Sequence, residues 1–67
     1  MKIRELLKCV QDFCVITICY ATNGHRMFQG TKDEVPTHLL EYYITLIIPN
    51  VDKLYIEAHE NAKFMEE

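Results

Sequence analysis

The chain has 67 residues, of which 49% are hydrophobic and 25% charged, and its formal net charge is −3. This balance is typical of an ordinary folded domain and excludes a disordered chain. The seven Lys and Arg residues are scattered along the sequence, which argues against a general nucleic-acid binder. The longest apolar runs, around Phe13–Ala21 and Tyr42–Pro49, are less than half the roughly 20 residues of a membrane-spanning helix.

The cysteines indicate the compartment. Cys9, Cys14 and Cys19 are odd in number and evenly spaced, which is a poor framework for disulfides. The first residues form a charged amphipathic segment and lack the apolar region of a secretory signal. We therefore expect a cytoplasmic protein with free thiols.

The first half of the chain predicts one helix and one hairpin. Residues 2–11 follow a helical pattern, since apolar side chains recur at i, i+3, i+4 and i+7. Phe13–Tyr20 is rich in β-branched and aromatic residues and predicts a strand. Asn23 and Gly24 then favour a type I′ turn, in which both central residues have positive φ. Arg26–Gly30 is the expected return strand.

The second half predicts a second hairpin. Residues 31–34 are polar and form a solvated connection, and Pro36–Glu41 predicts one or two helical turns, with proline at the first position. Tyr42–Ile48 is β-prone, and residues 49–52 have the composition of a turn. Lys53–His59 alternates between apolar and polar residues, as a strand with one buried face does.

These elements predict an α+β fold. Two hairpins form a four-stranded, largely antiparallel sheet, with the N-terminal helix on one face and a short helical turn between the hairpins. Residues 1–59 are expected to form a single domain. Residues 60–67 are expected to be a frayed tail or a short helix that docks Phe64 and Met65.

The first strand predicts self-association. It is apolar on both faces, and strands of that kind are normally buried on both. One short helix can cover only one face, and a second protomer related by a two-fold axis would cover the other. The alternative is that the short helix and the tail fold over that face. The expected interface, opposite the helix, consists of Cys14, Ile16, Ile18 and Ile47, in a dimer or larger homo-oligomer.

No pattern in the sequence indicates catalysis or a cofactor. His25, His38 and His59 stand apart from one another and from any cysteine pair, so we expect no metal site. Gly24 and Gly30 are too few for a phosphate-binding loop. A small hydrolase that uses His38 or His59 with a carboxylate is the enzymatic alternative, but general acid–base catalysis needs a positioned pair that the sequence does not show.

Aromatic residues supply the candidate binding site. Tyrosine offers a large contact area at low entropic cost and a polar tip, which suits recognition. Together with nearby polar side chains, the tyrosines could hold a nucleotide or a partner loop at a dimer seam. The alternative is that they belong to an interface core. The candidate ligand- or partner-binding residues are Tyr20, Asn23, Arg26, Tyr42, Tyr43, Thr45, Tyr55 and His59.

The chain resembles a group of very short proteins of phages and prophages. The resemblance rests on a helix of the type found at residues 3–7, a turn and return strand like residues 23–30, and a proline-leucine segment like residues 35–40 before a final hairpin. It implies a non-enzymatic protein that neutralises a host defence component in the host cytoplasm. Such proteins block a nuclease complex, as anti-CRISPR proteins do, or sequester a nucleotide signal in a homo-oligomer.

Two functional hypotheses follow. The first is a homo-oligomeric binding protein that acts by occupancy on a host protein or a small nucleotide. The second is a structural or regulatory accessory subunit whose apolar sheet face docks on a larger protein. Neither hypothesis requires a cofactor, a membrane or general nucleic-acid binding.

Overall fold

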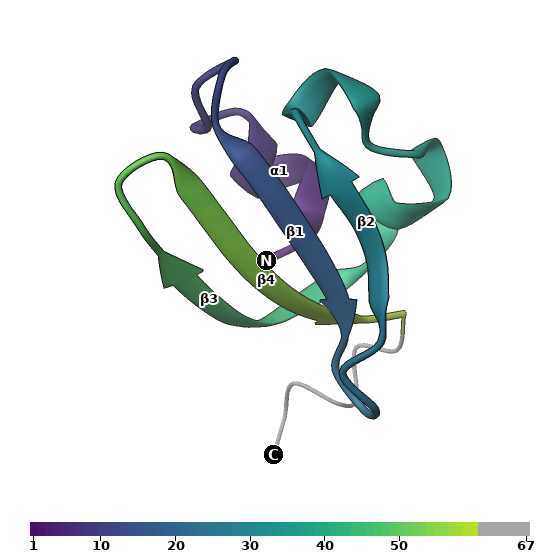
Figure 1. Ribbon diagram of the computed structural model, residues 1–67. Helices are drawn as coiled ribbons and strands as arrows, with labels where there is room; N and C mark the ends of the chain where they lie inside the picture. Colours follow the sequence, from purple (N-terminus) through teal and green to yellow (C-terminus); the bar gives the residue numbers. More distant parts are fainter. Residues whose placement is uncertain (61–67) are drawn as a thin grey trace.

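The computed structural model describes residues 1–60 and has the predicted α+β architecture (Figure 1). One α-helix precedes four strands, and two short 3-10 helices separate the strand pairs. The helix, α1, is Ile3–Leu7, and the strands are β1 (Val15–Tyr20), β2 (Arg26–Gly30), β3 (Tyr43–Pro49) and β4 (Lys53–His59). The 3-10 helices are η1 (Lys32–Glu34) and η2 (Thr37–Glu41).

The sheet is mixed, with the strand order β2-β1-β4-β3. Both predicted hairpins are present, since β1 pairs antiparallel with β2 and β3 pairs antiparallel with β4. The two central strands, β1 and β4, run parallel, with Ile18 beside Ile56. A parallel pair needs a long crossover connection, and residues 21–52 supply it. Local turn signals in the sequence specify each hairpin. They do not specify that β1 of one hairpin pairs with β4 of the other.

The helix is shorter than the residue 2–11 pattern predicts. After Leu7 the chain tightens into i→i−3 bonds, from Cys9 N to the Leu6 carbonyl (2.9 Å) and from Val10 N to the Leu7 carbonyl (3.3 Å). The Lys32 ammonium then donates to the Val10 carbonyl at 2.8 Å. This contact satisfies a carbonyl that a continued helix would have bonded internally.

The turn between β1 and β2 is not the expected type I′ turn. Gly24 has φ of 74°, and within the described residues it is the only position with positive φ, so Asn23 keeps an ordinary backbone conformation. The Asn23 side chain instead accepts a hydrogen bond from the His25 backbone N–H at 2.9 Å. This side-chain bond stabilises a longer loop over residues 21–25.

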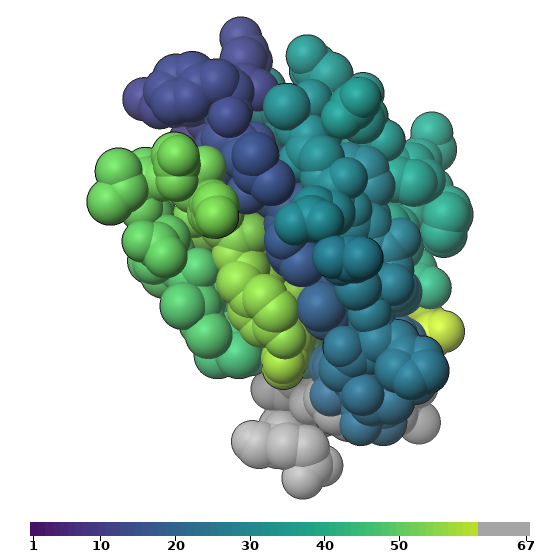
Figure 2. Space-filling model, viewed as in Figure 1, coloured from purple at the N-terminus to yellow at the C-terminus, as the bar shows by residue number. Residues whose placement is uncertain are grey.

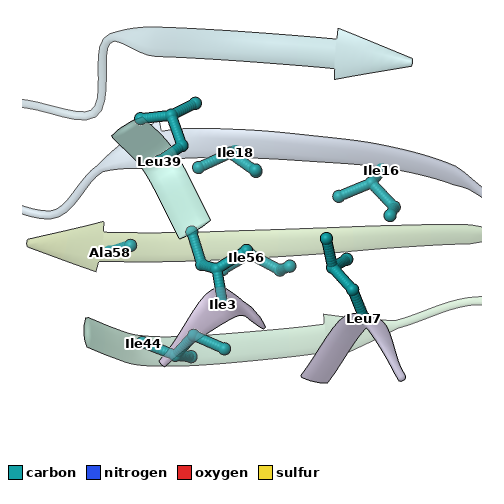
Figure 3. Close-up of a cluster of buried hydrophobic side chains, with 8 residues drawn as sticks. All are labelled: Ile3, Leu7, Ile16, Ile18, Leu39, Ile44, Ile56 and Ala58. Carbon is teal, nitrogen blue, oxygen red and sulfur yellow. The ribbon is translucent and has the colours of Figure 1, made fainter. Parts of the chain in front are cut away.

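The core lies between the sheet and the layer formed by α1 and η2 (Figure 3). Ile3 and Leu7 project from α1 onto the sheet, and Leu39 projects from η2. All the core side chains are buried. The sheet contributes Ile16, Ile18, Ile44, Ile56 and Ala58.

The predicted oligomer interface was wrong for Ile16 and Ile18. Both side chains are 0% exposed in the single chain, because they lie beneath α1 and η2 and not on the opposite face. The helix layer covers the face of β1 that carries the two isoleucines. Val15 and Thr17, which are smaller, lie on the other face. Burying an isoleucine contributes roughly 1.5–3 kcal/mol, so this arrangement of β1 buries more apolar area. Cys14 precedes β1 and is half-buried.

A β-bulge changes the expected alternation of β3. Ile44 pairs with Ala58 and Ile47 pairs with Ile56, so both isoleucines are on the helix side of the sheet. The register shifts between Ile44 and Leu46, and Thr45 is the extra residue. Ile47 therefore shares a face with Ile16 and Ile18, as predicted, but that face is the covered one. At the sheet edge Ile47 remains 38% exposed.

Within residues 1–60, no helix is long and apolar enough to cross a membrane. Of the predicted tail at 60–67, only Glu60 is described. The predicted docking of Phe64 and Met65 lies outside the described residues.

Candidate binding surface

The sheet face opposite α1, called the open face below, is not covered by any described element. In Figure 1 the sheet is seen from this side and α1 lies behind it. Thr17 pairs with Tyr55, and Tyr55 pairs with Ile48, so these side chains form one row across the sheet. Leu46 is next to this row and is 41% exposed, while Ile48 is 52% exposed. Figure 2 shows the side chains of this face packed across all four strands.

Tyr55 is held in place at the centre of the open face. Its hydroxyl donates to Glu57 Oε2 at 2.9 Å. Hydrogen bonds to the Glu57 carboxylate and to the Cys19 thiol, together with partial burial, raise the pKa of Tyr55 to about 12. Cys19 itself is only 5% exposed. The hydrogen bond to Glu57 therefore orients the Tyr55 ring within the fold.

Exposed apolar side chains collect along the outer edge of β3, the last strand in the sheet order. Val51, in the turn that follows β3, is 99% exposed, and Leu46, Ile47, Ile48 and Met1 are also largely exposed. A shallow cavity of about 270 Å³ opens here, and its lining carries no charged side chain. The lining consists of Met1, Ile44, Thr45, Leu46 and Ile47.

Tyr20 and His59 meet at the ends of the two parallel strands. Their rings stack with centroids 5.1 Å apart and an interplanar angle of 22°. The Tyr20 hydroxyl lies 3.3 Å from His59 Nε2 and donates to the Glu60 carboxylate. The hydrogen bond to Glu60 raises the pKa of Tyr20, and the same bond lowers the pKa of Glu60. These rings are stacked on each other within the fold.

The remaining predicted site residues are dispersed. The Arg26 guanidinium donates to Gln29 Oε1 at 3.0 Å, and the Thr45 hydroxyl donates to the Glu57 carbonyl at 3.2 Å. Tyr42 meets His38 edge-on, with ring centroids 6.4 Å apart. The eight candidate residues therefore do not form one site. Tyr43 pairs with His59, while Asn23 lies in the β1–β2 loop.

Sequence reasoning missed a charged cluster beside α1. The Glu41 carboxylate forms ion pairs with Lys2, at 3.0 Å, and with Arg4. Hydrogen bonds from both cations lower the pKa of Glu41. The cluster lines an open concavity of about 630 Å³ together with Lys8 and Tyr43. No signal in the sequence links Glu41 to α1, because the pairing depends on where η2 packs.

Among residues 1–60, no group of three or more His, Cys, Asp or Glu side chains is placed to hold a metal ion. The three cysteines are free. The open face and the β3 edge are therefore the candidate binding surfaces.

Comparisons of the chain with known family models, with curated proteins and with solved structures gave no significant match. The resemblance to phage and prophage proteins stays a prediction.

Proposed function

We propose that this chain is a non-catalytic binding protein that acts by occupancy, with the open face as its target-binding surface. One observation carries the proposal: α1 and η2 cover one side of the sheet, and no described element covers the other. An open row of Thr17, Tyr55 and Ile48 results.

The chemistry of the open face suits a macromolecular partner. Its centre combines the ring of Tyr55 and the hydrogen-bonded Glu57 carboxylate with aliphatic side chains, and Lys53 and Arg26 lie toward its borders. Aromatic and aliphatic side chains together with hydrogen-bonding groups are typical of protein interfaces. Because Tyr55 is already oriented by Glu57, binding would immobilise it at little entropic cost.

A protein partner is favoured over a nucleotide. Tyr20, one of the tyrosines expected to hold a nucleotide, is already stacked on His59. Arg26, another candidate ligand-binding residue, is bonded to Gln29. An inhibitor and an accessory subunit would use the same face, and the host-defence target suggested by the resemblance stays a prediction.

Site-specific photo-cross-linking tests this function. A benzophenone amino acid at Thr17 reports on the open face, and the same residue at exposed Lys8 reports on the helix side. In a lysate of the cells that produce the protein, we expect position 17, and not position 8, to give an adduct with a different protein. Equal labelling at both positions, or none at position 17, would overturn the proposal.

A further inference from the structure

We propose that the β3 edge pairs with β3 of a second copy, antiparallel and about a two-fold axis at Ile47. The pairing deepens the proposed function and rests on it, since it would join two open faces into one larger binding surface.

The β3 edge already accepts an antiparallel segment along its first part. Lys2 forms an antiparallel bridge with Tyr43. The Ile3 N–H donates to the Tyr42 carbonyl at 3.0 Å, and the Ile44 N–H donates to the Met1 carbonyl at 2.8 Å. β3 is the last strand in the sheet order, and among residues 1–60 no strand pairs with its outer edge from Thr45 to Pro49. An added strand would extend a pairing that the fold has begun.

The register identifies which backbone groups point outward. The Ile44 N–H points away from β4, because it donates to Met1, and Ile44 pairs with Ala58. Ile47 pairs with Ile56, two residues from Ala58, so its N–H and C=O share that outward direction. Pro49 pairs with Leu54 and follows the same rule, but it has no N–H to donate to an added strand. Ile47 therefore presents the outward N–H of this uncovered edge.

A two-fold axis at Ile47 makes the edge complementary to itself. The Ile47 N–H of each copy would meet the Ile47 carbonyl of the other, which forms a hydrogen-bonded antiparallel pair. Leu46 would then lie opposite Ile48 on the open-face side, and this contact occurs twice. Since Tyr43–Pro49 contains no charged residue, no like charges would meet in spite of the net charge of −3.

The opposite edge of the sheet is less suited to pairing. β2 has five residues, and its pairing with β1 is irregular between Ile18 and Cys19. Arg26 and Gln29 are exposed on it, and its last residue, Gly30, lies against the Glu34 side chain. Both edge strands carry a bulge, but a short, charged edge resists strand addition, while a longer apolar edge favours it. The second copy is therefore expected at β3.

Molar mass tests the proposal on the full chain. Size-exclusion chromatography with light scattering should give about twice the 7.9 kDa of one chain at high concentration, and the mass should fall on dilution. Ile47→Pro removes the outward N–H, and Leu46→Lys places like charges across the axis. Either change should weaken dimerisation about tenfold or more, while Gln29→Lys on the β2 edge should not. Circular dichroism of each variant reports whether it folds.

Disulfide capture tests the register and remains informative if Ile47→Pro unfolds. In a Cys9→Ser background, a mixture of Leu46→Cys and Ile48→Cys chains should form the mixed disulfide faster than either chain alone. Faster self-pairing of either single variant, or a monomer at every concentration, would overturn the two-fold pairing. A monomer that still cross-links a different protein from position 17 would leave the proposed function intact.

Discussion

At the scale of single residues, position in the fold decides what an isoleucine contributes. Ile18 and Ile48 both stand in strongly β-prone runs of the sequence. Ile18 is 0% exposed beneath the helix layer, whereas Ile48 is 52% exposed on the open face. Truncation of a buried isoleucine removes packing contacts and creates a cavity. At an exposed position water fills the space, so no cavity forms.

Truncation of these two residues should therefore differ strongly in effect. We expect Ile18→Ala to lower the free energy of unfolding by about 2–5 kcal/mol. The matched change Ile48→Ala should lower it by under about 1 kcal/mol. Urea denaturation of both variants at low protein concentration measures the difference. Similar losses at the two positions would contradict the burial of Ile18.

Tyr55 makes the free energy of unfolding depend on pH in the alkaline range. Its pKa is about 12 in the folded chain against an ordinary value of 10.0. Below the ordinary pKa both the folded and unfolded states hold this proton, so Tyr55 adds no pH dependence to the free energy of unfolding there. Between the two values the unfolded chain loses the proton first, and the free energy of unfolding falls as pH rises.

Titration of tyrosinate absorbance should show one tyrosine that ionises with a pKa of about 12. Glu57→Gln should shift this pKa toward 10.0, since the carboxylate that accepts the Tyr55 proton is its largest cause. Glu60→Gln is the control, because Glu60 bonds Tyr20 and not Tyr55. An unchanged Tyr55 titration in Glu57→Gln would contradict the hydrogen bond.

At the scale of elements, local irregularities decide how the strands are presented. The bulge at Thr45 moves Leu46 and Ile48 onto the open face and keeps Ile44 and Ile47 on the helix side. The loop between β1 and β2 depends on one left-handed residue, Gly24, at φ of 74°. Residues with a Cβ atom adopt this conformation at a cost, so the glycine is required by the backbone and not by packing.

Gly24→Ala should accordingly destabilise the fold by about 1–2 kcal/mol. No atom lies within 4 Å of the added Cβ, so the loss would come from backbone strain alone. His25→Ala, in the same loop and with ordinary φ, should have little effect on the thermal midpoint. Equal midpoints for the two variants would show that the loop relaxes to another conformation.

At the scale of the whole molecule, one layer of short helices covers one face of a four-stranded sheet. A chain of this size buries a smaller share of its surface than larger domains do, so its stability is marginal. Pairing at the β3 edge would bury Leu46 and Ile48 from both copies. Association of folded chains stabilises them by mass action.

The thermal midpoint should therefore rise with protein concentration. Over a range of about a hundredfold, scanning calorimetry of the unmodified chain should show a steady increase in midpoint. Leu46→Lys should remove this dependence, and Gln29→Lys should retain it. A midpoint that is independent of concentration in the unmodified chain would contradict self-association.

Much of the fold could be predicted from sequence because its signals are local. β-branched runs, the Asn-Gly turn and alternation in Lys53–His59 depend on near neighbours, and both hairpins are present. The candidate site could not be predicted in the same way. Tyr20 and His59 meet because β1 and β4 are parallel neighbours, and no local pattern specifies that pairing.

The predicted interface between copies was also wrong in part because it depends on tertiary packing. Sequence alone determined that β1 is apolar on both faces and that one short helix cannot cover both. Which face receives the helix is a tertiary choice, because it depends on the total area buried by Ile3, Leu7 and Leu39 against each side. The structure buries Ile16 and Ile18 and leaves the apolar edge of β3 exposed. That difference moves the proposed contact between copies from a sheet face to a sheet edge.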